Sequence, residues 1–226
     1  MARTAQELLD AVVVELAPDS AANPLVPFIE DGTANRSAIT ALALEQRSVI
    51  PADRRSFLHL AARSADAGEA ECAAFFRTLA EGEALAFDRL DALVAACGVG
   101  KTDADAYEPR AGCQAYPAYV AWLALNGTPV DVVLALTANF AAWGAYCATL
   151  VRALPDHYGF SEEACGFFAF FAEPAPELER RALAAVRAGM ERGPLDPAGS
   201  VLRYGKLLQR YEAMFWETLA DPARGL

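Results

Sequence analysis

Two glutamates are the residues best placed to do chemistry, because each falls on the apolar stripe of a predicted helix. In segment 201–221, large apolar side chains recur every three or four residues, and Glu212 lies on that face while Glu217 points away from it. Glu83 has the same kind of position in segment 67–97. A carboxyl group buried among apolar side chains needs a partner or keeps its proton, which is the setting of general acids and bases. Either glutamate could instead be structural, satisfied by a neighbouring Tyr, Arg or backbone group.

The composition predicts a soluble globular chain in the cytoplasm. The chain has 226 residues, of which 54% are hydrophobic, and its net charge of −11 argues against a nucleic-acid partner, which would require a basic surface. Charges and prolines interrupt every apolar stretch before the roughly 20 residues that a membrane helix needs. Acidic residues near the amino terminus stand where a signal peptide would be apolar, so we expect no export.

Cysteines and histidines give no indication of a metal or cofactor. The five cysteines are dispersed and never form a Cys-x-x-Cys pair, which predicts reduced, mostly buried thiols. His59 and His157 are the two histidines, and neither belongs to a Glu-x-x-His pair of the kind that di-iron bundles use. The first predicted helix contains no histidine that could bind haem. We therefore expect no metal and no cofactor.

The periodicity predicts an all-α fold, a single multi-helix bundle that occupies residues 1–226 as one domain. Every long segment repeats with a period near 3.6, and no alternating strand pattern occurs. Prolines predict an extended stretch at 23–28 and a helix break at Ile50-Pro51, and residues 101–112 read as a polar loop. The helices are expected at 5–16, 36–48, 53–63, 67–97, 113–125, 129–154, 161–171, 176–192 and 201–221.

The segment 129–154 is apolar on nearly all sides, so we place it at the centre of the bundle. It should pack against the helix that bears Glu212, and the two should share a cavity. Tyrosines and tryptophans among the aromatic residues each bring a polar atom that needs a partner. These side chains are mostly core, but a small aromatic or heteroaromatic ligand between the helices would satisfy several of them.

The order of several short motifs resembles the TenA family, which comprises thiaminase II-like proteins of the haem oxygenase-like fold. The resemblance covers residues 23 to 221, and the closing Tyr-Glu-x-x-Phe-Trp motif is its most specific part. The matching stretches are Asn23-Pro24, Asp31-Gly32-Thr33, Gly82-Glu83, Ala115-Tyr116-Pro117-Ala118-Tyr119 and Tyr211-Glu212-Ala213-Met214-Phe215-Trp216.

The resemblance implies a cofactorless hydrolase of thiamine-derived aminopyrimidines in vitamin salvage, assembled as a homodimer or tetramer. Such enzymes use a cysteine nucleophile, an aspartate on the pyrimidine and a carboxy-terminal glutamate as acid/base, which is Glu212 here. The family's Cys-x-Trp-x-Tyr pattern corresponds to Ala141-Ala142-Trp143-Gly144-Ala145, so the cysteine and tyrosine are both alanine. The position expected to hold the aspartate falls on Gln46 or, with a shift of one residue, on Arg47, so the aspartate is missing too. Phe87 and Phe171 stand where His and Tyr are expected.

Two functions remain open from the sequence. The first is a divergent C–N hydrolase in which Glu212 activates water directly on an aminopyrimidine or another small heteroaromatic compound. The second is a non-catalytic small-molecule-binding or accessory protein with a more apolar pocket, because the departures from the family pattern remove polar groups together. The ligand-binding residues expected in either case are Gln46, Tyr116, Phe140, Ala141, Trp143, Ala145, Phe171, Tyr211 and Phe215.

Overall fold

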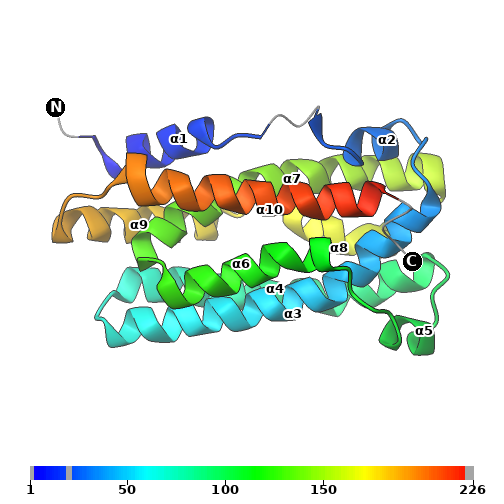
Figure 1. Cartoon of the computed structure of the whole chain (residues 1–226), viewed down its shortest axis with the longest axis horizontal. Helices are drawn as coiled ribbons and strands as arrows, with labels where there is room; N and C mark the ends of the chain where they lie inside the picture. Colours follow the sequence, from blue (N-terminus) through cyan, green and yellow to red (C-terminus); the bar gives the residue numbers. More distant parts are fainter. Residues whose placement is uncertain (1–2, 19–21, 222–226) are drawn as a thin grey trace.

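The computed structural model describes residues 3–18 and 22–221, and these ranges form a bundle of helices without a strand, which confirms the all-α prediction (Figure 1). Long helices lie side by side, with α10 over α7 and the α3–α4 pair on the opposite side of α6 (Figure 1). The helices are α1 (Ala5–Glu15), α2 (Val26–Glu30), α3 (Arg36–Asp66), α4 (Ala70–Ala96), α5 (Lys101–Asp105), α6 (Ala111–Asn126), α7 (Pro129–Tyr158), α8 (Glu162–Ala172), α9 (Pro176–Arg192) and α10 (Leu202–Ala220), with a π-helical turn at Pro197–Val201.

Helix α3 is continuous, so the predicted break at Ile50-Pro51 is wrong. Pro51 has no N–H to donate within the helix, and a proline in a helix interior costs about 3 kcal/mol. Apolar residues on both sides of Pro51 are buried in the bundle, among them Ile50, Phe57 and Leu60. Burying such side chains contributes about 1.5–3 kcal/mol each, which outweighs the local cost.

The predicted extended stretch at 23–28 contains the short helix α2 instead. Pro27 lies in the first turn of α2, where a backbone N–H has no helical acceptor in any case. Ahead of the helix, the Asn23 side-chain oxygen accepts hydrogen bonds from the backbone N–H of Leu25 and of Val26, both at 2.9 Å. The side chain of Asn23 thus satisfies two backbone donors at the start of this helix.

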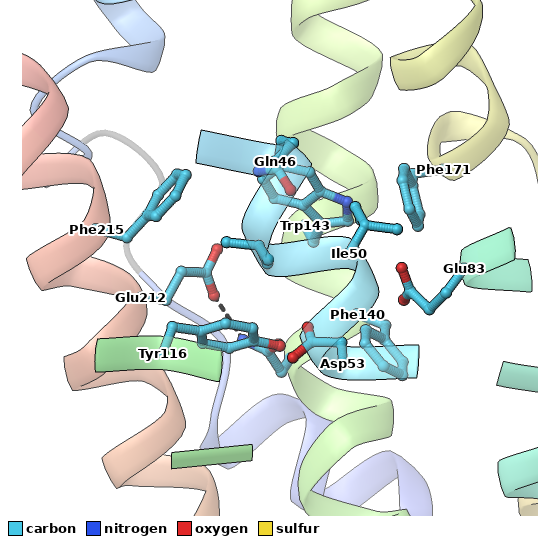
Figure 2. Close-up of a pocket in the computed structure, with 12 residues that line it drawn as sticks. Gln46, Ile50, Asp53, Glu83, Tyr116, Phe140, Trp143, Phe171, Glu212 and Phe215 are labelled. Carbon is cyan, nitrogen blue, oxygen red and sulfur yellow. Dashed lines mark hydrogen bonds between the residues drawn. The ribbon is translucent and has the colours of Figure 1, made fainter. Parts of the chain in front are cut away.

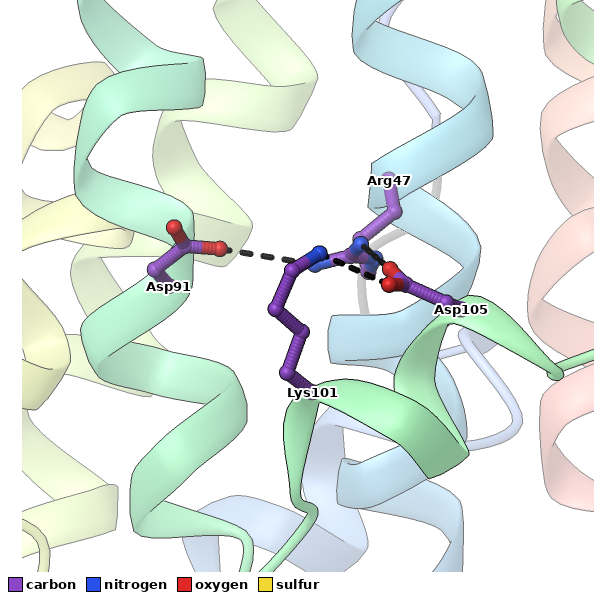
Figure 3. Close-up of polar contacts among 4 residues, drawn as sticks. All are labelled: Arg47, Asp91, Lys101 and Asp105. Atoms are coloured by element: carbon purple, nitrogen blue, oxygen red, sulfur yellow. Dashed lines mark hydrogen bonds and ion pairs between the residues drawn. The ribbon is translucent and has the colours of Figure 1, made fainter.

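The predicted polar loop at 101–112 begins with a second short helix, α5, which an ion-pair cluster holds in place (Figure 3). The Arg47 guanidinium lies 2.7 Å from Asp105 and 3.4 Å from Asp91, so it joins α3 to α5 and α4. Lys101 Nζ lies 2.7 Å from Asp105 one turn along α5. These charges are partly solvated, so we expect the cluster to contribute modestly to stability.

The rest of this connection is held by Glu45, which is fully buried on α3. One of its carboxylate oxygens accepts from Tyr107 Oη at 2.7 Å and from the Arg110 backbone N–H at 2.8 Å. The other oxygen accepts from Gln114 Nε2 at 2.8 Å. Glu45 is therefore a structural carboxylate whose hydrogen-bonding capacity is used by the segment that leads into α6.

Glycines end two of the helices and allow close packing at a third. Gly98 and Gly159 adopt left-handed φ angles of 78° and 72° after α4 and α7, which confirms the helix end predicted at Gly98. Gly205 of α10 lies so close to Leu16, just after α1, that a Cβ atom there would overlap the leucine side chain. In contrast, a Cβ at Gly166 of α8 would meet its nearest neighbour only at 4.0 Å.

The core consists of two apolar clusters, one toward each end of the bundle, and α3, α4, α7 and α10 contribute to both. Between the parts of each helix that belong to the two clusters lies a polar residue that faces a shared interior space. We call this set of four residues the polar layer, and its members are Asp53, Glu83, Asn139 and Glu212. Polar groups buried between the two apolar clusters reduce the stability of the fold unless each has a partner. Such a layer is therefore where a functional site is expected.

Helix α7 occupies the central position that was predicted for it. It contacts α8, α10, α2, α1 and α9. Among the helices that the structure describes, it alone is long and apolar enough to cross a membrane by length and composition, although half of its most apolar stretch is buried inside the bundle. Its contacts on several sides account for an apolar composition without a membrane.

Candidate functional site

A cavity of about 50 Å³ lies at the polar layer, between α3, α4, α6, α7, α8 and α10 (Figure 2). One water needs roughly 10–15 Å³ by a comparable measure, so the cavity has room for a few waters or a very small molecule. The prediction that α7 and α10 share a cavity is confirmed. Its lining consists of Gln46, Val49, Ile50, Asp53, Glu83, Tyr116, Asn139, Phe140, Trp143, Phe171, Glu212 and Phe215.

Helix α3 presents its lining residues at spacings of three and four, which keeps them on one face. Gln46 and Asp53 are separated by two helical turns, and they share this face because the helix runs without interruption through Pro51. Asp53 is 5% exposed and Glu83, on α4, is 6% exposed. Their carboxyl groups lie close together on one side of the cavity (Figure 2).

This carboxyl pair lacks the partners that buried charges usually have. Among the described residues, no group forms a hydrogen bond with Asp53 Oδ1 or with Glu83 Oε2. Burial raises the pKa of both carboxyls well above the usual range, and the charge of Asp53 raises the pKa of Glu83 further. Both carboxyls therefore hold their protons to a higher pH than solvated carboxyls do while the cavity holds nothing positive.

Glu212 approaches the cavity from α10, on the other side. Its carboxylate accepts a hydrogen bond from Asn139 Nδ2 at 2.5 Å and a longer one from Trp216 Nε1 at 3.3 Å. Asn139 Oδ1 in turn accepts from Tyr116 Oη at 2.9 Å, so one hydrogen-bonded chain joins α6, α7 and α10. Burial raises the pKa of Glu212 from 4.5 to about 7, and its two hydrogen bonds act in the opposite direction.

The cavity is acidic and has no basic counterpart. None of its twelve described lining residues is Arg, Lys or His, and three of them are carboxylic acids. No group of three or more His, Cys, Asp or Glu residues in the described part of the chain is arranged to hold a metal ion. The arrangement is suited to proton transfer, or to binding a group that donates hydrogen bonds and carries positive charge.

Seven of the ten residues proposed from the sequence come together around this cavity. They are Gln46, Tyr116, Phe140, Trp143, Phe171, Glu212 and Phe215. Tyr211 does not reach it, because its ring packs against Tyr119, with centroids 4.9 Å apart. Ala141 and Ala145 are exposed and also lie outside the lining.

The positions of these two alanines follow from helix geometry. Residues two apart are separated by about 200° around a helix, so neither position can share the face of α7 on which Trp143 meets the cavity. The residue one turn before Trp143 on that face is Asn139. Cys147, one turn after it, is fully buried and is not in the lining, and burial raises the pKa of its thiol well above the usual range. The cavity therefore presents no cysteine nucleophile.

Sequence reasoning missed Asp53 and Asn139, and it treated Glu83 only as a possible site residue. Asp53 was interpreted as an acidic residue in the first turn of a new helix after Pro51. Asn139 has no ionisable group, but an amide in the middle of an otherwise apolar helix was a usable signal. The structure also places His59 on the surface of α3.

Comparisons with known proteins bear on the fold. No family model matches the chain, and no curated protein matches it. A solved structure is similar over 97% of this chain and 93% of its own length, with a TM-score of 0.74 and 15% sequence identity. It is a domain of unknown function with a haem oxygenase-like fold from Shewanella denitrificans OS217. At this identity the likeness extends to the architecture alone, and we conclude that the chain has the haem oxygenase-like fold.

Proposed function

We propose that the protein is a TenA-like acid/base hydrolase that acts on a small amino-substituted heteroaromatic compound, with Glu212 as the group that accepts and returns the proton. The observation that supports this most directly is a carboxyl group with a pKa of about 7 at a cavity within the helix bundle. General acid/base catalysis is most effective when the pKa of the group lies near the working pH. The resemblance of the closing motif to the TenA family supports the choice of an aminopyrimidine-like substrate.

The reaction that fits this arrangement is hydrolysis of a C–N bond by direct attack of water. Ionised Glu212 takes a proton from the water as its oxygen forms a bond to carbon, and the protonated carboxyl then gives the proton to the leaving nitrogen as the C–N bond breaks. Asn139 and Trp216 hold the carboxylate in one orientation through their hydrogen bonds. Because the cavity contains no cysteine, no covalent intermediate on a thiol is part of the proposal.

The size of the cavity limits the substrate. A cavity of about 150 Å³ accommodates benzene, whereas this one measures about 50 Å³, so a single heteroaromatic ring enters only when side chains move. Trp143 and Phe171 are partly exposed and pack edge to face, with ring centroids 5.9 Å apart. Movement of these two rings would enlarge the cavity, and neither ring forms a hydrogen bond with Glu212.

The alternative, a non-catalytic protein with a more apolar pocket, has less support from the side chains. That hypothesis depended on Phe87, Ala141, Ala145 and Phe171 as apolar replacements around a ligand. Only Phe171 is in the lining, and the other three are exposed. Three carboxyl groups at one small cavity make it acidic, which favours a role in proton transfer.

The test is turnover of a panel of single-ring aminopyrimidines, followed by liquid chromatography and mass spectrometry of the released amine. Removing a general base lowers the rate by roughly 10²–10⁴-fold, so we expect Glu212→Gln to lose turnover to that extent. Glu217→Gln is the matched control, because Glu217 is exposed on the same helix. No turnover of any member of the panel, or equal turnover by Glu212→Gln, would refute the proposal.

A further inference from the structure

The carboxyl pair of Asp53 and Glu83 has a property that the proposed reaction at Glu212 does not use. Both side chains are more than nine-tenths buried, both point into the cavity (Figure 2), and each has one oxygen without a hydrogen-bond partner among the described residues. Buried polar atoms in native proteins are almost always satisfied by protein, water or ligand. Two unsatisfied acceptors facing the same small space therefore indicate that something with donors binds between them.

We propose that Asp53 and Glu83 form a subsite for the cationic nitrogen of a small organic ligand, which donates N–H groups to Asp53 Oδ1 and Glu83 Oε2. The inference rests on the proposed function in one respect, because it takes the bound ligand to be the substrate of that reaction. The substrate class is then a protonated amine or amidine. Such a cation carries two or more donors on one charged centre, which matches two acceptors that lie close together on the neighbouring helices α3 and α4. A quaternary ammonium ion has no donor and would leave both oxygens unsatisfied.

Charge and ring composition at the cavity support this assignment. The twelve described lining residues provide three carboxyls and no Arg, Lys or His, so the protein itself supplies no counter-charge there. Phe140 lies directly beside both carboxyl groups, where an aromatic ring would face the ligand (Figure 2). Aromatic faces attract cations, so this wall favours an organic cation over a neutral donor of equal size.

Proton exchange should accompany binding. Burial raises the pKa of both carboxyls, and a cation bound between them lowers it, so binding favours release of their protons. The other ionisable groups in the lining are Tyr116 on α6 and Glu212 on α10, while α7 and α8 contribute none. Glu212 also becomes ionised as the pH rises through about 7, which adds to the attraction. Affinity for a permanently protonated amine should therefore increase from about pH 6 to about pH 8.

The experiment measures binding rather than turnover, by isothermal titration calorimetry and by the thermal midpoint of the full chain. The probes are two small cations, methylammonium and acetamidinium, both added as chlorides. Tetramethylammonium chloride and potassium chloride are the cationic controls, and acetamide is the neutral control. We expect the two probes to bind and to raise the midpoint, more strongly at about pH 8 than at about pH 6. They should do so in the Glu212→Gln variant as well, where the proposed chemistry is blocked, so loss of turnover and loss of binding remain distinguishable.

The variants locate the subsite. Asp53→Asn and Glu83→Gln keep the side-chain shape and remove the charge, so each should fold and should weaken probe binding by about 10- to 100-fold. Asp66→Asn on α3 and Glu81→Gln on α4 are exposed controls and should leave binding unchanged. Circular dichroism at the helix minimum verifies folding of every variant.

Three results would overturn the proposal. The first is the absence of binding by both probes in the wild type, and the second is binding that the Asp53→Asn and Glu83→Gln variants retain at full strength. The third is a raised midpoint with Mg²⁺, Mn²⁺ or Zn²⁺ that neither organic cation reproduces, which would assign the pair to a metal ion instead.

Discussion

Replacing Glu212 by Gln should change how the stability of the protein depends on pH. Burial raises the pKa of Glu212 from 4.5 to about 7, and at about 1.4 kcal/mol for each pH unit this difference corresponds to up to about 3 kcal/mol. Between those two values, the folded protein keeps a proton that the unfolded chain has released. The free energy of unfolding contributed by this group therefore decreases as the pH rises through that window and is constant above about pH 7.

The assay is urea unfolding, followed by circular dichroism, at several pH values between about 5 and 8. Asp53 and Glu83 contribute slopes of the same sign in both proteins, because burial raises their pKa values too. The difference between wild type and Glu212→Gln isolates Glu212, and the variant should gain about 2.5 kcal/mol relative to wild type on going from pH 5 to pH 8, because most of the window between the two pKa values lies in that range. Glu217→Gln, exposed on the same helix, should follow the wild type at every pH.

Parallel pH profiles for wild type and Glu212→Gln would refute the reasoning. They would mean that Glu212 titrates like a solvated glutamate, and that the polar layer does not hold it in the state that general acid/base catalysis requires. A positive result also sets an expectation for activity, because the proposed base must be ionised. Turnover should then increase as the pH rises through about 7.

Three further substitutions test the packing that positions the site. Glu45→Ala should lower the free energy of unfolding in urea by about 3 kcal/mol, because three donors lose their acceptor, whereas the exposed Glu108→Ala should change it by less than about 0.5 kcal/mol. Gly205→Ala should lower it by about 1–3 kcal/mol through overlap with the α1 segment, while Gly166→Ala, which has space, should raise the thermal midpoint slightly. Arg47→Ala should cost about 1 kcal/mol at low salt and less at about 0.5 M NaCl, and a salt-independent loss would contradict an ion-pair origin.

The sequence was sufficient for the overall architecture because helical periodicity depends on local residue spacing. It identified Glu212 by its position on an apolar stripe, and it placed the uniformly apolar 129–154 segment against that helix. The contact between Asn139 and Glu212 is the physical outcome of that placement. The spacing of residues along the sequence does not reveal which group is the partner of each polar atom, because the partners come from helices that are distant in the chain.

One wrong local prediction concealed half of the site. Treating Pro51 as a helix break separated Asp53 from Gln46, whereas the continuous α3 places both on the face that lines the cavity. Proline disfavours a helix interior by a known amount, but burial of the surrounding side chains is a tertiary effect that a single sequence does not display. The prediction was wrong because it included the cost of a proline in a helix but not the free energy gained by burying the neighbouring side chains. It concealed Asp53, on which the proposed subsite depends.

The hydrogen-bonded chain from Tyr116 through Asn139 to Glu212 has a direction, and that direction depends on where the proton sits. While Glu212 is ionised, Asn139 turns its NH₂ toward the carboxylate and its oxygen toward the phenol, as the structure shows. A protonated Glu212 could donate its own O–H to Asn139 only if the amide turned over, and the amide NH₂ would then face Tyr116 Oη, which would lose its acceptor. The orientation of one amide in the middle of α7 therefore couples the protonation of a carboxyl group on α10 to the hydroxyl group of a tyrosine on α6.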